Sequence, residues 1–401
     1  MHLFLFDVDS VLVEANGYLR ALQDTVAHFS RQMGVGAHPP TEAEVRALEA
    51  HGLTSEWDSA PTCVAALLVE RLRLEPGFPQ EPSFALPADW ADALTTLAAH
   101  SFPLPHPGYA DLARRVGERM ANQPGAAQAA RAVLWEDVLA TPNLEPHRSA
   151  LDALFDTLLG RTHDFYRAPI TRHFQHLVIG SQGVRQTYGV DPDFESAAYL
   201  QEYDRPLLAT DVRTRLRKAV EAKAVRIALY TARPSLPPAD ANVTADGYSP
   251  EAEMARSLVG LDDYPLIGLG RVRWLAERAG ERVEHLVKPS PVQALAAIGA
   301  AQSGQEATAL EAALVLHQDS ELGPPLADLD AAAVHVFEDS PGGIDAVRHA
   351  VEALQAAGLD VTWQPHGITP ADGPKAKAMA TRSVPTYPSI NEAIAIALEA
   401  T

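Results

Sequence analysis

The sequence predicts an α/β fold in which a doubly wound parallel sheet carries a large inserted α-helical domain. A short apolar run stands at residues 3–6, and the segment 14–206 shows helical spacing with almost no strand-like run. After residue 207, strand-like and helical segments alternate. Such alternation is typical of a parallel sheet with helices on both faces. We therefore expect a core built from residues 1–13 and 207–401, and a helical insertion over residues 14–206.

The first strand is expected at residues 3–6. This run is far too short to span a membrane, but it suits a strand that is buried on both faces. Two carboxylates follow it, Asp7 and Asp9, and their side chains share a face if the chain continues in an extended form. Open α/β sheets bind ligands at the carboxyl ends of their strands, so both side chains could line one pocket.

Helical spacing dominates the insertion. Apolar residues recur every three to four positions from residue 18 to residue 29, and Thr41 with Glu44 forms the pattern of a capping box. Further helices are expected at 64–72, 90–100, 109–121, 126–139 and 147–159.

Three strand candidates after residue 207 each lead to a polar group. They are 225–230 before Thr231, 283–287 before Lys288, and 334–337 before Glu338 and Asp339. Because the carboxyl ends of parallel strands meet at one edge, these groups should converge on the two N-terminal aspartates. A further strand is expected at 361–363, and helices are expected at 211–222, 251–259, 271–279, from 291, at 342–354 and at 390–398.

Charge and composition narrow the possible partners. The 401 residues include 32 Lys and Arg against 52 Asp and Glu, which gives a net charge of −20. Such a surface repels nucleic acid and anionic membranes, so we expect neither as a partner. Cys63 is the only cysteine, which excludes an intramolecular disulfide and a cysteine-based zinc site. We find no signal-peptide pattern and no apolar stretch of about 18 residues, and therefore expect a cytoplasmic protein.

The polar groups at the strand ends suit phosphoryl transfer. A carboxylate can act as a nucleophile, and a second carboxylate nearby can serve as acid and base. Carboxylate oxygens from Asp7 and Asp339 suit a hard ion such as Mg²⁺. A hydroxyl and an ammonium at the same place suit a phosphoryl group, whose transfer depends mainly on positioning and charge neutralisation.

Four segments carry these groups: Phe6-Asp7-Val8-Asp9-Ser10-Val11, Leu229-Tyr230-Thr231, Lys288-Pro289-Ser290-Pro291 and Phe337-Glu338-Asp339-Ser340-Pro341-Gly342-Gly343-Ile344. Together they resemble the four motifs of the haloacid dehalogenase-like (HAD) superfamily of phosphatases and phosphotransferases. The last segment is similar to the form found in the branch that contains β-phosphoglucomutase and related small-molecule phosphatases. The helical insertion lies at the position of the family's cap domain.

The resemblance implies a Mg²⁺-dependent phosphatase that hydrolyses a small phosphorylated metabolite. Asp7 would attack phosphorus and form an aspartyl phosphate, while Asp9 would protonate the leaving group and then activate water. Thr231 would donate a hydrogen bond to the phosphoryl oxygens, and Lys288 would neutralise negative charge. The implied metal ligands are Asp7, the backbone carbonyl of Asp9, Asp339, and Glu338 either directly or through water.

Two other functions stay open. One is a phosphomutase of the β-phosphoglucomutase type, in which the aspartyl phosphate passes to a sugar. The other is a non-enzymatic HAD-fold protein whose helical block binds a partner. The presence of Asp9 argues against a dehalogenase, because members with that activity generally lack it.

Two features depart from the family pattern. Ser10 stands where glycine is common, and the insertion is far longer than a simple helical cap. Possible substrate contacts are Arg20, Trp57 and Arg233, with packing as the alternative role for Trp57 and a surface salt bridge for Arg233. Asp345 is a weaker candidate and could be a helix surface residue.

Overall fold

A computed structural model of the chain describes residues 1–75, 85–123, 125–370 and 372–401. Within these residues the chain forms two compact units, and each is described by itself. Unit 1 comprises Met1–Asn16, Gln182–Asp191 and Leu200–Thr401, and unit 2 comprises Gly17–Ser181 and Pro192–Tyr199.

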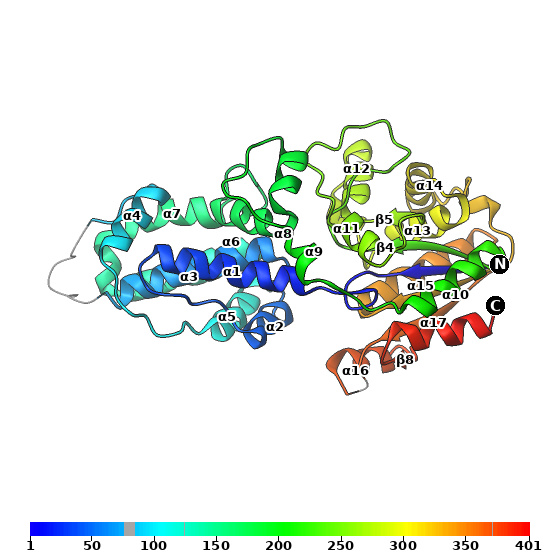
Figure 1. The fold of residues 1–401 in the computed structure, drawn as a ribbon, viewed down its shortest axis with the longest axis horizontal. Helices are drawn as coiled ribbons and strands as arrows, with labels where there is room; N and C mark the ends of the chain where they lie inside the picture. The colour runs from blue at the N-terminus through cyan, green and yellow to red at the C-terminus, as the bar shows by residue number, and fades with distance from the viewer. Residues whose placement is uncertain (76–84, 124, 371) are drawn as a thin grey trace. The chain divides into compact units, whose positions relative to one another are not determined.

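Unit 1 contains a parallel sheet whose strand order is β5-β4-β1-β6-β7-β8 (Figure 1). The N-terminal strand β1 lies inside this sheet and pairs in parallel with β4 and with β6. The six strands are β1 (His2–Phe6), β4 (Val225–Tyr230), β5 (Leu266–Ile267), β6 (Ala332–Glu338), β7 (Val361–Ile368) and β8 (Thr386–Tyr387). Since all pairings are parallel, the carboxyl ends of the strands lie at one edge.

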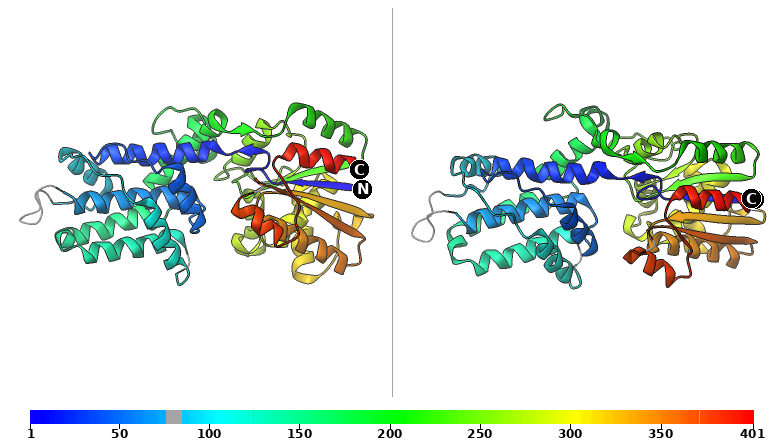
Figure 2. Two further views of the ribbon diagram at one scale, coloured as in Figure 1. Left: turned by 90° about the horizontal axis from the view of Figure 1, so that it is seen from below. Right: turned by 60° about the horizontal axis from the view of Figure 1, so that its bottom comes forward.

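Helices cover both faces of the sheet, as the views in Figure 2 show. Successive side chains of β1 point to opposite faces, so Leu3 and Leu5 belong to one apolar cluster and Phe4 and Phe6 to the other. The first face is covered by α12 (Leu269–Ala279), α13 (Pro291–Ser303), α14 (Glu306–Asp319) and α15 (Pro341–Ala356). The second is covered by α10 (Thr210–Glu221), α11 (Glu251–Leu258) and α17 (Ile390–Glu399). The predicted α/β class with a doubly wound parallel sheet is thereby confirmed.

One predicted strand is wrong. Residues 283–287 do not join the sheet, because the chain forms a short 3₁₀ helix, η2 (Val283–His285), at this point. Val283, Leu286 and Val287 are spaced as on one side of a helical turn, and only Leu286 among them is buried. Lys288 therefore follows a turn and not a strand. The remaining short elements of unit 1 are η3 (Leu326–Asp328) and α16 (Pro374–Ala380).

A two-stranded antiparallel ladder forms in unit 1 beside the segments where the chain leaves for unit 2 and returns. Strand β2 (Val13–Glu14) pairs with β3 (Arg205–Pro206). The return runs through α9 (Tyr199–Tyr203), which is followed at once by Asp204 and β3.

Within its described residues, the regular elements of unit 2 are helices. Its elements are α1 (Asn16–Gln32), α2 (Glu42–Ala50), α3 (Glu56–Arg73), α4 (Trp90–Ala99), α5 (Tyr109–Met120), α6 (Ala126–Ala140), η1 (Pro142–His147), α7 (Arg148–Leu159) and the first part of α8 (Pro169–Tyr188). The predicted capping box is present, since Thr41 and Glu44 exchange side-chain and backbone hydrogen bonds at the start of α2. Helix α8 is interrupted at Gly180, whose φ of 71° and ψ of 171° are not helical. None of the described helices combines the length and the apolar character needed to cross a bilayer.

Three histidines form a hydrogen-bonded row across the sheet of unit 1. His2 Nδ1 lies 3.0 Å from His335 Nε2, and His335 Nδ1 lies 3.2 Å from His366 Nε2. The rings of His335 and His366 stack with an interplanar angle of 9°. Burial lowers the pKa of His335 to about 3 and that of His366 to about 4, so both imidazoles are neutral at pH 7.

Candidate active site

Four predicted site residues lie at the carboxyl edge of the sheet in unit 1. Asp7 follows β1, and its backbone N–H donates to the carbonyl of Phe337, 3.0 Å away, which continues the ladder between β1 and β6. Thr231 follows β4, Glu338 ends β6, and Asp339 comes next. All four side chains are buried. The parallel sheet thus brings Asp7 together with polar groups that follow it by more than 200 residues.

Lys288 bridges two of these carboxylates. Its Nζ lies 2.8 Å from Asp7 Oδ1 and 2.8 Å from Glu338 Oε2, and its side chain is only 12% exposed. The ammonium also lies 3.8 Å from the centre of the Tyr230 ring, whose hydroxyl donates to Glu338 Oε2 at 2.8 Å. Burial alone would lower the pKa of Lys288, but the two carboxylates raise it above its ordinary value, so the ammonium stays charged.

Gln293 fixes the turn that carries Lys288. Its amide Nε2 donates to the carbonyls of Thr231 and Ile267, each at 2.9 Å, and its Oε1 accepts from the backbone N–H of Lys288 at 3.3 Å. This glutamine is fully buried near the start of an alanine-rich helix, where its amide needs hydrogen-bond partners, but the sequence alone does not show that burial. Neither Gln293 nor Tyr230 was among the site residues predicted from the sequence.

We call Asp7, Glu338 and Asp339 the acidic cluster, because one carboxylate oxygen of each lies within 4.8 Å of the others. Burial, followed by the neighbouring Glu338 carboxylate, raises the pKa of Asp7 well above its ordinary value, against the opposite effect of Lys288. Burial also raises the pKa of Asp339, although Lys375 forms an ion pair with it. The cluster sets three carboxylates against two paired lysines, and a small divalent cation with a preference for oxygen ligands fits such a cluster.

The turn after β6 holds Glu338 in place. Ser340 Oγ donates to Glu338 Oε1 at 2.8 Å and accepts from the backbone N–H of Gly343 at 3.1 Å, which caps helix α15. A Cβ atom at Gly343 would lie 1.9 Å from Glu338 Oε2, so the carboxylate occupies space that only glycine leaves open. Burial alone would raise the pKa of Glu338, but Lys288 and hydrogen bonds from Tyr230 and Ser340 lower it.

Asp9 is turned toward Arg233. The turn that carries Asp9 is closed by a 2.8 Å hydrogen bond from the backbone N–H of Ser10 to the carbonyl of Val13, and Ser10 itself has a φ of 61°. Arg233 Nε lies 2.8 Å from Asp9 Oδ1, and Arg233 Nη2 lies 3.0 Å from Asp204 Oδ2. Arg233 is therefore a buried partner of two carboxylates and not part of an exposed surface salt bridge.

The other two candidate substrate contacts, Arg20 and Trp57, belong to unit 2. Arg20 Nε forms an ion pair with Asp24 at 3.0 Å, and the Arg20 side chain is 51% exposed. Trp57 Nε1 donates to Gln175 Oε1 at 3.1 Å. These contacts lie within unit 2, and a role for either residue toward a substrate stays a prediction.

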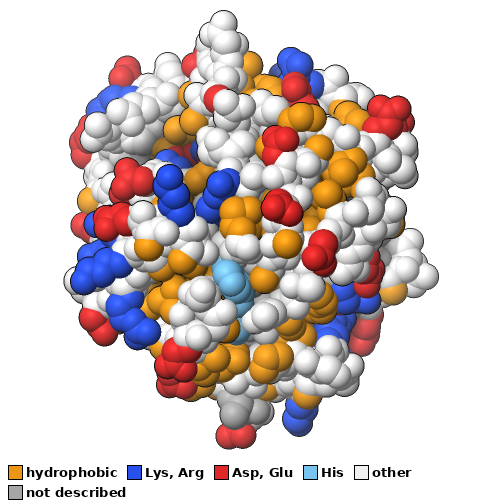
Figure 3. Space-filling view, turned by 90° about the vertical axis from the view of Figure 1, so that its right-hand side faces the viewer, with side chains coloured by type: hydrophobic (Ala, Val, Ile, Leu, Met, Phe, Trp, Pro, Cys, Tyr) orange, Lys and Arg blue, Asp and Glu red, His pale blue; other side chains and the backbone are white. Residues whose placement is uncertain are grey.

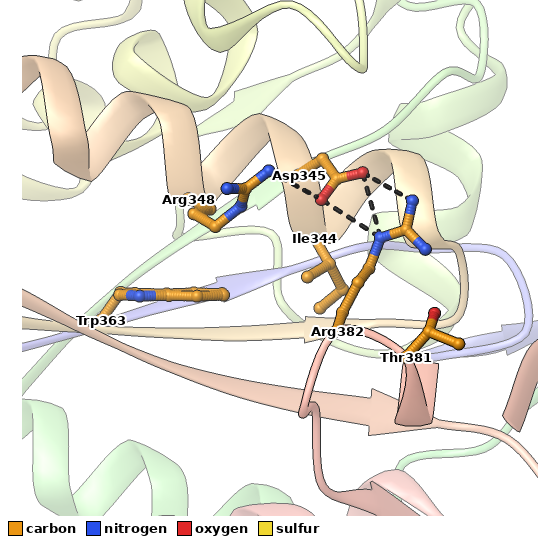
Figure 4. A pocket seen from close by; sticks show the side chains of 6 residues that line it. All are labelled: Ile344, Asp345, Arg348, Trp363, Thr381 and Arg382. Atoms are coloured by element: carbon orange, nitrogen blue, oxygen red, sulfur yellow. Dashed lines mark hydrogen bonds and ion pairs between the residues drawn. The ribbon is translucent and has the colours of Figure 1, made fainter. Parts of the chain in front are cut away.

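The side chain of Asp345 interacts with arginine side chains, as Figure 4 shows. It forms ion pairs with Arg348 and Arg382, at 3.3 and 2.9 Å, and hydrogen bonds from Arg382 lower its pKa. Together with Trp363 these residues line a pocket of about 430 Å³ over helix α15 and strand β7. Asp345 therefore pairs with Arg348 on its own helix and with Arg382, which follows α16.

The charges on the face that carries the two chain termini are mixed. Figure 3 shows basic and acidic side chains interspersed with apolar ones on this face. Interspersed charges of opposite sign allow exposed ion pairs, such as the pair in unit 1 between Arg278 and Glu311 at 3.1 Å.

No protein-family model matches the sequence, and no curated protein matches it. Among solved structures, the chain is similar to a Northeast Structural Genomics Consortium target, with a TM-score of 0.60 and 13% identity over 99% of this chain and 98% of that one. At this identity the likeness supports the fold alone. Two weaker likenesses carry no argument: phosphatase Tt82 from Thermococcus thioreducens (TM-score 0.40, 13% identity, 95% of this chain and 98% of that one) and the 2-haloacid dehalogenase from Pseudomonas syringae pv. Tomato DC3000 (TM-score 0.28, 14% identity, 100% of each chain).

Proposed function

We propose that this protein is a Mg²⁺-dependent phosphatase of the HAD type that hydrolyses a small phosphorylated metabolite through an aspartyl phosphate. The observation that carries the proposal is the contact of Lys288 Nζ with both Asp7 and Glu338, each at 2.8 Å, at the carboxyl edge of a parallel sheet. A buried carboxylate held by an ammonium, with a second aspartate two residues away, is the arrangement that the four sequence motifs imply.

In the first step, Asp7 supplies the nucleophile. Oδ1 accepts from Lys288, so Oδ2 is the oxygen that attacks phosphorus, and the bond from phosphorus to the leaving oxygen breaks. Asp9 gives its proton to that oxygen, so the substrate departs as an alcohol. Lys288 and the hydroxyl of Thr231 stabilise the negative charge of the phosphoryl oxygens.

In the second step, water attacks the aspartyl phosphate. Asp9, now a carboxylate, accepts a proton from this water, and the bond between phosphorus and the Asp7 oxygen breaks. Asp7 is regenerated as a carboxylate, inorganic phosphate is released, and Asp9 carries its proton again. Lys288 remains an ammonium through both steps, because its contacts with Asp7 and Glu338 favour the charged form.

The acidic cluster would hold the magnesium ion, with the backbone carbonyl of Asp9 as a further ligand. When bound, the ion supplies positive charge that offsets both the cluster and the phosphoryl group. Glu338 already accepts from Lys288, Tyr230 and Ser340, and we therefore assign it the outer position, through water. Asp7 and Asp339 are then the direct carboxylate ligands.

A phosphate-release screen over sugar phosphates, nucleotides, phosphoacids and amino-acid phosphates tests the proposal. We expect release by the wild type with Mg²⁺, loss of release with EDTA, and a decrease of about 1,000-fold or more for Asp7→Asn, since a nucleophile is removed. Asp345→Asn is the matched control, because this aspartate is also paired with basic side chains, but these are Arg348 and Arg382.

Release that persists in Asp7→Asn or in EDTA would contradict the proposal. Phosphorus NMR of the products separates hydrolysis, which yields inorganic phosphate, from a mutase reaction, which yields an isomeric sugar phosphate. A wild type that turns over no compound while it binds a stable partner would favour the non-enzymatic alternative.

A further inference from the structure

Arg233 connects Asp9 to a second buried carboxylate, Asp204. The side chains of Arg233 and Asp204 are 2% and 1% exposed, whereas that of Asp9 is 38% exposed. One guanidinium therefore joins a carboxylate inside unit 1 to one that reaches the surface of the same unit. Asp204 lies outside the four sequence motifs, which therefore assign it no role.

The guanidinium fixes the plane of the Asp9 carboxylate. Arg233 Nε and Nη2 lie 2.8 and 2.5 Å from Oδ1, and Nε lies 3.1 Å from Oδ2. Oδ1 thus accepts two hydrogen bonds, and Oδ2 accepts one longer bond. A planar guanidinium orients a carboxylate more strictly than an ammonium does, because its N–H groups have fixed directions.

Asp204 fixes the guanidinium in turn. It directly precedes β3, and β3 is paired with β2, the strand that follows the Asp9 turn. The backbone N–H of Arg233 donates to Thr231 Oγ1 at 3.2 Å, which ties the arginine to the end of β4. Three segments, 9–14, 204–206 and 231–233, are therefore held around one side chain.

We propose that Arg233, held by Asp204, is the positioning residue for Asp9: it leaves Oδ2 as the oxygen that exchanges a proton with the leaving group and with water. The inference rests on the proposed phosphatase function and assigns two residues that the sequence motifs do not. A role for Arg233 as a direct substrate contact is less well supported, because an anion would compete with two carboxylates already bound to it.

The leaving group distinguishes a positioning role from a merely structural one. An alkyl phosphate needs a proton on its leaving oxygen, whereas p-nitrophenyl phosphate releases a stable phenolate without one. General acid catalysis contributes about 100-fold to 10,000-fold, so a misplaced Asp9 should lower kcat/KM, which reports release of the leaving group, by this amount for only the first kind of substrate. A general loss of folding would slow both kinds alike.

The experiment compares kcat/KM for p-nitrophenyl phosphate and for the alkyl phosphate that the wild type hydrolyses fastest in the screen, because kcat/KM does not include the later hydrolysis of the aspartyl phosphate, in which Asp9 acts with either substrate. For the double variant R233Q/D204N, we expect a decrease of about 100-fold with the alkyl phosphate and of less than about 3-fold with p-nitrophenyl phosphate. The double variant removes both charges, so no buried charge is left without its partner. R233K should show the same selectivity with a smaller loss, because an ammonium keeps the charge but not the planar contact.

R271K is the matched control. Arg271 is likewise buried and paired with two carboxylates, Glu253 at 2.5 Å and Glu306 at 2.7 Å, but it contacts neither Asp9 nor the acidic cluster through these bonds. Both kcat/KM values should stay within about 3-fold of the wild type, or fall together if folding suffers.

Each other outcome decides against the inference. Equal losses with both substrates in R233K and in the double variant would make Arg233 structural, and unchanged rates would make it dispensable. Turnover of p-nitrophenyl phosphate alone by the wild type would show that no acid is in use. No turnover of any substrate by the wild type would instead overturn the proposed function itself.

Discussion

Replacing His335 and His366 by phenylalanine should make the stability of unit 1 less sensitive to mild acidification. Both rings are buried, and burial lowers the pKa of His335 to about 3 and that of His366 to about 4, from an ordinary value of 6.5. The unfolded chain binds a proton on each imidazole near pH 6.5, and the folded chain does not until the pH falls much further. The stability that these neutral histidines support is thus fully present above pH 6.5 and is lost as the pH falls from 6.5 toward 4.

The expected magnitude follows from the two pKa values. When the pH falls from about 7.5 to about 5.5, each histidine should lower the free energy of unfolding by about 1.4 kcal/mol, and the pair should lower it by about 3 kcal/mol. Phenylalanine at both positions keeps an aromatic ring in the stack with Phe337, whose ring centre lies 4.7 Å from that of His366. The double variant should therefore show a pH dependence that is smaller by about 3 kcal/mol.

Urea unfolding at the two pH values measures this difference, with hydrogen exchange of peptides from β6 and β7 to follow unit 1 separately. Both values lie above the sequence pI of about 5.1, so the net charge stays negative. His317→Gln on helix α14 is the control, because this histidine is exposed and should leave the pH dependence unchanged. A difference between wild type and double variant of less than about 1 kcal/mol would refute the reasoning, since the two histidines would then titrate alike in both states.

Three single substitutions test the geometry of the candidate site. Gly343→Ala should lower phosphate release at least about 10-fold and destabilise the fold by about 2 kcal/mol, since its Cβ would lie 1.9 Å from Glu338 Oε2. Gly342→Ala is the control: nothing described lies within 4 Å of its Cβ, so phosphate release and stability should stay within experimental error. Equal effects in the two variants would contradict this. Ser10→Gly should raise the free energy of unfolding by about 1 kcal/mol in urea titrations, because Ser10 has a φ of 61°, and a decrease would argue against strain there. Lys375→Met should lower the Mg²⁺ concentration for half-maximal release by roughly 10-fold, because its ammonium pairs with the acidic cluster; a higher requirement would show that this lysine supports the metal site.

Local sequence patterns were sufficient to predict the three central strands of the sheet. The runs that end at Phe6, Tyr230 and Phe337 are apolar on both faces, as expected for central parallel strands, and the structure places them side by side. The strand predicted before Lys288 was wrong because a short apolar run with one buried residue also fits a helical turn. Strand β5, with only two residues, gives too short a pattern to be seen.

The candidate site was predictable only where a residue stands next to a strand or in a motif. The structure brings Asp7, Glu338 and Lys288 into contact, while their chemical roles stay predictions. Asp204 and Gln293 lie outside the motifs and reach the site through contacts between distant segments. A single sequence carries no local signal for such contacts, because they depend on how the sheet and its connecting strands are assembled.

The central position of β1 has a consequence for the synthesis of the chain. Its neighbours β4 and β6 leave the ribosome roughly 220 and 330 residues after it, which takes some tens of seconds at about 5–20 residues per second. During this time four apolar residues, 3–6, have no sheet to join, whereas the helices of unit 2 contact one another locally and can pack as soon as they emerge. Nascent chains should therefore acquire the helical unit first and keep β1 as an exposed aggregation-prone strand until β6 arrives, an order that force measurements on stalled ribosomes would record.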